Sequence, residues 1–262
     1  MTAKLSRRLL LTLATGLFAL GAQAQTALDS IAKSKTIKIA IPTDYPPYGF
    51  VGPDMKPQGL DVAMAELIAA KLGVKAELLP VTSANRIPYL QTRKADLVIS
   101  TLGKNPEREK VINFSAAYAP FYQAVFAAKS LAIKSWADLA GKSVAVTRGA
   151  MEDQELAKVA PATLEYKRFE DNNATIAAFA AGQTQLLATS ASVAGNLMVR
   201  NPGLNTEFKL LLKDSPCFVG VAKGEDALLA KVNEIIAAAQ AAGELEALSK
   251  KWLGRGTGEL PL

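Results

Sequence analysis

Arg108 follows a short run of small polar residues, and together these residue types could bind a carboxylate. A guanidinium donates two parallel hydrogen bonds to a carboxylate, whereas a lysine ammonium is a single point charge. Ser100, Thr101 and the backbone N–H of Gly103 precede Arg108 where a predicted strand gives way to a helical turn, which can form an anion-binding nest. Charged neighbours at 104, 107, 109 and 110 alone would indicate a solvated arginine. The spacing from the Ser100–Thr101 pair favours an anion-binding role instead.

Two tyrosines and two further arginines are additional candidates for binding a small molecule. Tyr45 and Tyr48 lie in a proline-containing loop after the first predicted strand, and each offers apolar area with a polar tip. The alternative is an exposed loop with incidental aromatic residues. Arg86 lies on the first turn of a predicted helix that follows Ser83. It could bind a ligand there, and the alternative is an arginine exposed to solvent. Arg148 directly follows another predicted strand and could add a third cation.

The sequence excludes several kinds of catalysis. Histidine is absent from the 262 residues, and Cys217 is the only cysteine. The commonest general base and metal ligand is therefore missing, and Ser-His and Cys-His catalytic pairs are excluded. Cys217 lies in an apolar run, 217–221, which favours a small buried side chain over a reactive thiol. We expect no catalytic residue, no metal site and no cofactor.

The first 24 residues have the features of a secretory signal peptide. Lys4, Arg7 and Arg8 precede an apolar run at 9–20, and Ala22 and Ala24 supply the small residues that a signal peptidase reads. The pair of arginines leaves both the general secretory route and the twin-arginine route open. Without the three basic residues the formal charge falls from +6 to +3. The remaining charge forms no basic run, so we expect no nucleic-acid partner.

Short strand patterns alternate with helical patterns in two successive units. The first unit has predicted strands at 36–41, 76–81 and 96–100, with a helix at 60–72 and another from Ser83, its expected N-cap, to about residue 94. The second has predicted strands at 143–147, 164–169 and 185–189, with helices at 149–159 and 174–181. A β-α-β-α-β order predicts an α/β fold in which each unit is a mostly parallel sheet flanked by helices.

Two strand-like segments, 121–128 and 210–221, join the units, so we expect the chain to leave the first unit once and to re-enter it once. The predicted division is a signal peptide at 1–24, lobe 1 at 25–119 and 217–262, and lobe 2 at 120–216. A ligand would then bind between the lobes, at strand ends and helix N-termini. Such an arrangement suits a hinged clamp.

Five motifs in sequence order carry a resemblance to a known family. They are TDYPPYGF at 43–50, GLDVAMA at 59–65, DLVISTLG at 96–103 ahead of Glu107 and Arg108, AGKSVAV at 140–146, and KWLG at 251–254. With them the chain resembles the bacterial periplasmic solute-binding proteins of the polar amino acid ABC uptake family, family 3, over essentially all of its length after residue 24. The resemblance implies the two-lobed type II periplasmic-binding-protein fold, a monomer, and a permease in the inner membrane as partner.

The resemblance also implies roles for residues of lobe 1. Arg108 matches the arginine that grips the α-carboxylate of the ligand, and Ser100, Thr101 and Gly103 match the donors around it. Tyr45 and Tyr48 match the aromatic wall. The stretch TSANRIP at 82–88 resembles the glutamate/aspartate-binding branch, in which an arginine at the place of Arg86 reaches a second carboxylate. We therefore count Arg86 and Ser83 among the ligand-binding residues.

Lobe 2 departs from the pattern of the family. Members that bind α-amino acids usually carry an aspartate for the ammonium group where this chain has Ser190, and a Gly-Thr-Thr stretch is replaced by Gly149, Ala150 and Met151. A hydroxyl accepts a hydrogen bond from an ammonium group but does not neutralise it. Glu152 or Asp153 could supply the anion instead. We expect Arg148, Gly149, Met151 and Ser190 to line the ligand on this side.

Three functions follow as hypotheses. The leading one is capture of a small carboxylate-bearing solute, a polar and acidic amino acid, by clamp closure in the periplasm for an ABC importer. A dicarboxylate or another organic acid is an alternative ligand. A dehydratase on the same fold, acting on prephenate-like substrates, would need a general acid, for which Glu152, Asp153 and Asp44 are candidates. A sensory domain that feeds a membrane receptor is the third hypothesis.

Overall fold

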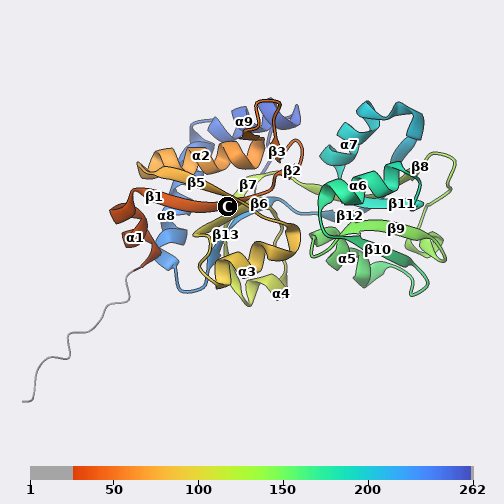
Figure 1. Cartoon of the computed structure of the whole chain (residues 1–262), viewed down its shortest axis with the longest axis horizontal. Helices are drawn as coiled ribbons and strands as arrows, with labels where there is room; N and C mark the ends of the chain where they lie inside the picture. Colours follow the sequence, from red (N-terminus) through yellow and green to blue (C-terminus); the bar gives the residue numbers. More distant parts are fainter. Residues whose placement is uncertain (1–25, 261–262) are drawn as a thin grey trace, which may run out of the picture.

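The computed structural model describes residues 26–260 and contains two five-stranded sheets that lie side by side (Figure 1). The predicted signal peptide lies outside the described residues. Within residues 26–260, no helix is both long and apolar enough to span a membrane. The sheet of lobe 1 has the order β5-β1-β6-β13-β7, built from β1 (Thr36–Ile41), β5 (Lys75–Pro80), β6 (Leu97–Leu102), β7 (Ile112–Ala119) and β13 (Cys217–Ala222).

Helices cover both faces of the sheet of lobe 1 because successive side chains of its strands point to opposite sides. Ile39 and Ile41 of β1 pack in the larger cluster with α2 (Leu60–Leu72) and α8 (Asp226–Ala241), whereas Ala40 packs on the other side with α3 (Arg86–Gln91). Short or peripheral helices complete the lobe, namely α1 (Ala27–Ser34), the 3-10 turn Ser83–Asn85, α4 (Pro106–Glu109) and α9 (Glu244–Leu253).

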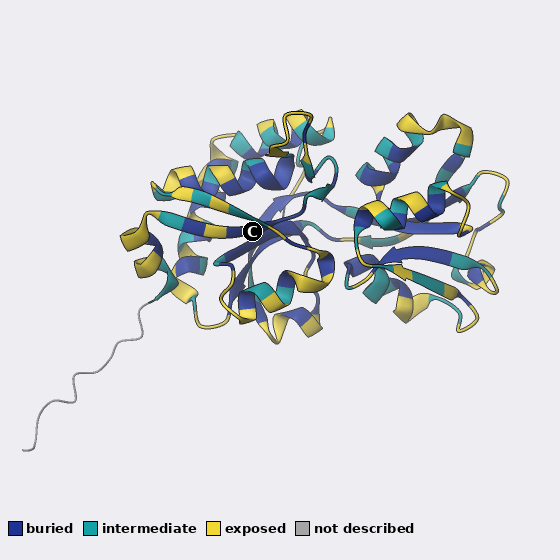
Figure 2. Cartoon of the chain, in the orientation of Figure 1, coloured by how far each residue is buried: buried dark blue, intermediate teal, exposed yellow. Residues whose placement is uncertain are grey.

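The sheet of lobe 2 has the order β10-β9-β11-β8-β12. Its strands are β8 (Tyr122–Ala128), β9 (Ser143–Thr147), β10 (Glu165–Phe169), β11 (Leu186–Ser190) and β12 (Thr206–Asp214). One apolar cluster joins the sheet to α5 (Met151–Val159) through Leu156, and a second joins its other face to α6 (Asn172–Ala180) and α7 (Ala191–Arg200). The 3-10 turns Trp136–Leu139 and Pro202–Leu204 lie in the connections. Figure 2 shows the inner strands of both sheets buried, among them β6, β13 and β11, while the edge strands β5, β10 and β12 are more exposed.

Each sheet has four strands in one direction and one reversed strand, which confirms the predicted mostly parallel α/β architecture. The reversed strands are β13 in lobe 1 and β8 in lobe 2, and each is the strand that directly follows a crossing between the sheets. The predicted segment 210–221 is not one strand. It is the end of β12 and the start of β13, in different sheets, with Ser215 and Pro216 between them.

The two crossings are hydrogen-bonded to each other. The backbone N–H of Ser215, in the second crossing, donates to the carbonyl oxygen of Phe121, in the first, at 3.0 Å. Two adjacent extended segments therefore connect the lobes, a geometry that permits rotation about one axis.

A small third sheet positions the two tyrosines at the edge of lobe 1. It consists of β2 (Asp44–Tyr45), β3 (Gly49–Val51) and β4 (Pro57–Gln58). Gly59 follows it with φ 129°, and a Cβ at this position would lie 2.3 Å from the carbonyl oxygen of Tyr48. Only glycine therefore allows the loop with Tyr48 to pack so closely against the start of α2.

Candidate functional site

Arg108 lies on α4, buried between the lobes. Asn105 caps this helix, because its Oδ1 accepts the backbone N–H of Arg108 at 2.9 Å. The Arg108 side chain is 4 % exposed and donates from Nη1 to the carbonyl oxygen of Gly103 and from Nη2 to that of Gly149 in lobe 2, at 2.9 and 3.0 Å. Burial, and then nearby Arg86, lower the pKa of Arg108 to about 10, so the guanidinium is still charged at neutral pH.

Arg86 is a second buried cation in the same region. It lies at the start of α3 and is 5 % exposed, and its Nη2 donates to Ser83 Oγ at 2.6 Å. Burial lowers the pKa of Arg86, while nearby Glu152 partly restores it. Ser83 is therefore not the predicted N-cap: Thr82 holds the cap position of the 3-10 turn, and the Ser83 hydroxyl faces Arg86. The structure thus places both predicted lobe 1 arginines together.

The predicted anion nest lies at the end of β6. Thr101 adopts a left-handed conformation with φ 43°, which is costly for a β-branched residue. Its backbone N–H donates to Asp61 Oδ2 at 2.8 Å, while Tyr118 donates to Asp61 Oδ1 at 2.7 Å. Ser100 Oγ is buried without a protein partner. Burial raises the pKa of Asp61 to about 6. Sequence reasoning missed Asp61 as a support of this turn, although it quoted the GLDVAMA motif.

Tyr45 and Tyr48, which the sequence predicts to line the ligand, stack on each other and reach lobe 2. Their rings stack with centroids 5.9 Å apart. Tyr45 Oη lies 3.1 Å from Thr189 Oγ1, accepts the backbone N–H of Ser190 at 3.1 Å, and donates to Glu152 at 3.3 Å. Tyr48 donates to Ser192 Oγ at 3.2 Å.

Glu152, in the first turn of α5, is the buried anion of lobe 2. The residue is 5 % exposed, and burial raises the pKa of its carboxyl group, while the charges of Arg86 and Arg108 and the bond from Tyr45 lower it. Asp153, the other anion considered from the sequence, instead pairs with Arg168 at 2.9 Å. The site therefore holds one carboxylate, that of Glu152, opposite two guanidinium groups. The sequence alone did not show which of Glu152 and Asp153 would supply this carboxylate.

The other predicted residues of lobe 2 lie at the same interface. Ser190 is fully buried and caps α7, because its Oγ accepts the N–H of Val193 at 3.2 Å. Met151 is 1 % exposed, and its sulfur lies 3.6 Å from Asn105 Nδ2. Gly149 has φ 72°, and a Cβ there would lie 2.9 Å from Ala84 Cα of lobe 1. The close approach of the lobes requires glycine at this position.

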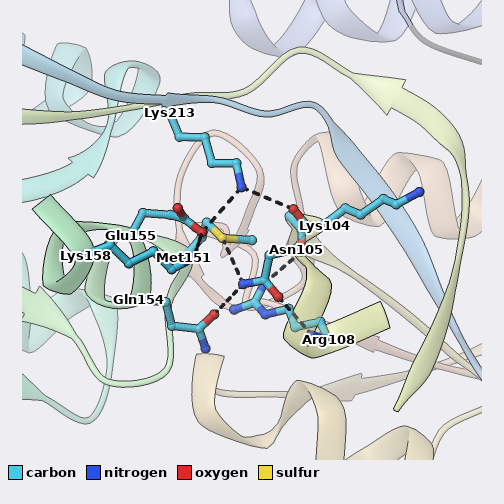
Figure 3. Close-up of polar contacts among 9 residues, drawn as sticks. Lys104, Asn105, Arg108, Met151, Gln154, Glu155, Lys158 and Lys213 are labelled. Atoms are coloured by element: carbon cyan, nitrogen blue, oxygen red, sulfur yellow. Dashed lines mark hydrogen bonds and ion pairs between the residues drawn. The ribbon is translucent and has the colours of Figure 1, made fainter. Parts of the chain in front are cut away.

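Polar contacts between the lobes extend around these residues. Figure 3 shows the amide nitrogen of Asn105, in lobe 1, directed toward both Met151 and Gln154 of α5, with Asn105 Nδ2 2.9 Å from Gln154 Oε1. Lys213, from the last part of β12, reaches the carbonyl oxygen of Lys104 at 3.3 Å and Glu155 at 3.4 Å. On the opposite side of the interface, Asp44 accepts from the backbone N and Nδ2 of Asn172, at 2.7 and 2.9 Å. These contacts describe a closed arrangement of the lobes.

Arg148 is not brought together with the other two arginines. Its side chain is half exposed, and its Nε pairs with Glu170 at 2.7 Å on the surface of lobe 2. The preceding strand ends with Thr147, which faces inward to Asn172 and Thr175, so the next residue points outward. The expectation that Arg148 adds a third cation to the cleft is therefore wrong for this structure, in which Arg148 forms an ion pair at the surface.

Comparison with known proteins identifies the family to which the chain belongs. The model of the bacterial extracellular solute-binding proteins, family 3, matches residues 37–255. The chain belongs to this family. The match spans most of both lobes and confirms the resemblance given by the five sequence motifs.

Individual relatives cover nearly the whole chain. This solute-binding protein is 27 % identical over 229 residues to the L-cystine-binding protein TcyJ of Escherichia coli (strain K12), covering 87 % of this chain and 86 % of that protein. It is similar to an ancestral arginine-binding protein bound to arginine, with a TM-score of 0.79, 31 % identity and coverage of 84 % and 99 %. It is also similar to the ancestral amino acid-binding protein AncCDT-1, a precursor of cyclohexadienyl dehydratase, with a TM-score of 0.77, 29 % identity and coverage of 87 % and 99 %. These neighbours confirm the two-lobed type II fold.

Proposed function

We propose that this solute-binding protein captures a polar α-amino acid in the periplasm and presents it, as a monomer, to the permease of an ABC importer. The observation that carries the proposal is the placement of buried Glu152 opposite buried Arg86 and Arg108, on two lobes that close on each other. An α-amino acid offers one carboxylate and one ammonium group. Such a pair of charges matches a site with cations on one wall and an anion on the other.

Each wall has its own role in the proposed complex. Arg108, Ser100 and Gly103 bind the α-carboxylate, and Glu152 binds the ammonium group. Arg86 and Ser83 bind an acceptor at the far end of the ligand, which is a second carboxylate in the favoured case of glutamate or aspartate. Tyr45 and Tyr48 pack against the carbon chain. The relatives support amino acids as the class of ligand, since one is named for L-cystine and another is bound to arginine.

The charged side chains buried between the lobes affect which ligand the site prefers. The sequence indicated a strongly positive cleft, with three arginines and no ammonium-binding aspartate. Arg86, Arg108 and Glu152 are buried, whereas Arg148 pairs with Glu170 at the surface, and buried Asp61 adds a second carboxylate near Arg86. The second carboxylate of an acidic amino acid adds an ionic partner for Arg86, whose Nη2 donates to the neutral hydroxyl of Ser83. A dicarboxylate without an ammonium group would leave Glu152 unpaired, and a buried unpaired charge is costly.

A thermal-shift screen of the purified mature chain tests the proposal. The screen compares the common L-amino acids with L-cystine, glutarate and succinate, and a ligand at 100 times its Kd adds about 2.7 kcal/mol to the free energy of unfolding. We expect the largest shift from glutamate or aspartate. A protein stabilised by dicarboxylates and by no amino acid would contradict the proposal.

A dehydratase is the second candidate, because one observation favours it. Glu152 is a buried carboxyl group with a raised pKa that faces two arginines, which is the environment of a general acid beside a bound carboxylate. AncCDT-1 is described as an amino acid-binding precursor of such an enzyme. A turnover assay with a prephenate-like substrate distinguishes the two functions, since a binding protein releases its ligand unchanged.

A further inference from the structure

Gln123 is a buried polar residue for which the fold provides no hydrogen-bond partner. It is the second residue of β8, its exposed fraction is 0 %, and both Oε1 and Nε2 of its side chain are buried without a partner. An unpaired buried amide loses its hydrogen bonds to water and gains none from the protein, which destabilises the fold. Buried polar groups are nearly always satisfied in native proteins, so Gln123 requires an explanation.

The register of the lobe 2 sheet fixes the direction of the Gln123 side chain. Gln123 lies opposite Ser190 of β11 on one side and opposite Lys213 of β12 on the other. Directly opposite residues of antiparallel strands project from the same face. Alternation along β8 places Gln123 on the face of Val125 and Ala127, which pack in the cluster with Leu156 of α5.

Both neighbours of Gln123 in this row contact lobe 1. The backbone N–H of Ser190 donates to Tyr45 Oη at 3.1 Å, and Lys213 Nζ donates to the carbonyl oxygen of Lys104 at 3.3 Å. Gln123 lies between them, at the end of the sheet that faces lobe 1 and on the side of α5, whose first turn carries Glu152. Arg86 Nε, Arg108 Nε and Ser100 Oγ, on lobe 1, are likewise buried without a partner. Four side chains with unpartnered buried polar atoms, Gln123 among them, thus lie where the two lobes meet, while others, such as those of Tyr166 and Trp252, lie elsewhere.

We propose that Gln123 is a ligand-contacting residue whose side-chain amide hydrogen-bonds the amino acid enclosed between the lobes. An amide has both kinds of group that a zwitterion requires: Oε1 accepts from an ammonium group, and Nε2 donates to a carboxylate. Gln123 therefore recognises the ligand without adding charge to the site. Its place on the strand that begins at the first crossing couples ligand binding to the segment about which the lobes rotate.

This inference rests on the proposed function, and its test is a pair of variants with opposite expectations. Gln123→Met keeps the length of the side chain and removes the unpaired amide. We expect the melting temperature of the ligand-free protein to stay the same or rise, while the affinity for the amino acid falls at least tenfold. A residue with a purely structural role would lose stability and affinity together.

Thr206→Val is the matched control. Thr206 lies at the opposite end of the same strand pair, opposite Ala128, and its Oγ1 is also buried without a partner. The variant should raise the melting temperature and leave the affinity unchanged. Calorimetric titrations of both variants use L-glutamate, L-glutamine, L-cystine and L-arginine as separate probes.

The outcomes separate this inference from the proposed function. If Arg108→Ala abolishes binding and Gln123→Met binds within threefold of the unchanged protein, Gln123 is not a ligand residue, although the site stands. If none of the four probes binds the unchanged protein, the proposed function and the inference both fall. Should Gln123→Met not fold, the side-chain amide resonance of Gln123 in a glutamine-labelled sample, assigned with Gln123→Glu, must shift on ligand addition. An unmoved resonance would overturn the inference.

Discussion

Arg108 of lobe 1 donates from Nη2 to the carbonyl oxygen of Gly149 in lobe 2, at 3.0 Å. The same guanidinium donates from Nη1 to Gly103 within its own lobe. Arg108 therefore belongs to the proposed carboxylate site and also to the contact between the lobes. Bound ligand and closed lobes are linked through one side chain, which is how a ligand can favour one of two conformations.

Arg108→Ala should abolish ligand binding while the ligand-free protein stays folded. The substitution leaves the carboxylate of the ligand desolvated without its bidentate partner, which costs about 2–5 kcal/mol, or roughly 30-fold and more in Kd. Calorimetric titration measures the affinity, and circular dichroism checks the fold. Binding within threefold of the unchanged protein would show that the carboxylate site is placed wrongly.

Ligand binding should increase the fraction of molecules in which the two lobes are closed. The closed contacts, such as Tyr48 with Ser192 and Asp44 with Asn172, break when the lobes separate, and ligand adds contacts only in the closed form. We expect the radius of gyration from small-angle scattering to fall when ligand is added. Ser192→Ala removes one closed-form hydrogen bond and should raise the radius of the ligand-free protein. Identical scattering with and without saturating ligand would rule out the hinged mechanism.

Arg86→Ala and Arg148→Ala form a matched pair. Arg86 is buried beside Ser83, whereas Arg148 is half exposed and pairs with Glu170 at the surface. Arg86→Ala should weaken glutamate at least tenfold and alanine much less, because only glutamate has a second carboxylate. Arg148→Ala should leave both affinities unchanged, since exposed ion pairs contribute little. Equal losses from the two variants would contradict the placement of Arg86 at the far end of the ligand.

The fold could be predicted from the sequence because its signals are local. Strands β1, β5, β6, β9 and β10 are short β-type runs between helical patterns, and helix α2 ends at a glycine. The exchange of sheets between β12 and β13 could not be predicted, because 210–221 is continuously strand-like and only Ser215 and Pro216 separate the two strands. The reversal of β8 and β13 depends on tertiary pairing, which periodicity does not report.

The residues of the candidate site also fall into two groups, those that local sequence signals predict and those that only tertiary packing defines. Motif and spacing predict one shared site for four residues, because each lies at the end of a strand or at the start of a helix. These residues are Arg108, Arg86, Tyr45 and Tyr48. Arg148 also follows a strand end, but the side to which it points depends on the register of β9. Glu152 and Asp153 are adjacent in one helix, and only packing decides that Glu152 turns inward. Gln123 and Asp61 have no local signal beyond their polarity, because their roles come from burial.

Asp61 should lower the stability of the protein at neutral pH. Burial raises the pKa of its carboxyl group to about 6, above the usual 3.8, so the folded protein binds this proton more tightly than the unfolded chain. The contribution of Asp61 to the free energy of unfolding is thus largest below pH 4 and is lost as the pH rises through 6. A shift of this size corresponds to about 3 kcal/mol. Asp61→Asn removes the titration and keeps the size of the side chain.

Urea unfolding of Asp61→Asn and the unchanged protein from pH 4 to 7.5 measures this effect. We expect the stability of the variant, relative to the unchanged protein, to rise with pH. A constant difference over this range would show that Asp61 titrates as in an unfolded chain.

Glu152 should make the binding of amino acids depend on pH. Burial raises its pKa above the usual 4.5, and the ionised form is the one that pairs with an ammonium group. The affinity for glutamate should therefore fall as the pH decreases through the pKa of Glu152, while Glu152→Gln binds weakly with little dependence on pH. Glutarate lacks the ammonium group and should bind Glu152→Gln at least as well as the unchanged protein. Calorimetry at pH 4.5–8 decides between these outcomes, and parallel profiles for both ligands would exclude Glu152 as the ammonium partner.

Ser190→Asp tests whether the site needs a second anion on lobe 2. The sequence alone indicates that an aspartate here should improve the binding of amino-bearing ligands, because Ser190 leaves the ammonium group without a counter-charge. The structure argues for the opposite result. Ser190 Oγ already caps α7, and its backbone N–H is joined through Tyr45 Oη to Glu152, so a carboxylate at 190 would lie close to an existing buried carboxylate.

Like charges close together oppose each other's ionisation, and the added anion would repel the carboxylates of an acidic ligand. Aspartate is also a good N-cap, so the fold itself should tolerate the change. We expect Ser190→Asp to fold normally and to bind glutamate several-fold more weakly, with its preference shifted toward neutral or basic amino acids. In the double variant Ser190→Asp with Glu152→Gln, the single remaining carboxylate should restore part of the affinity for glutamate. A gain in glutamate affinity for Ser190→Asp alone would show that Glu152 does not serve the ammonium group.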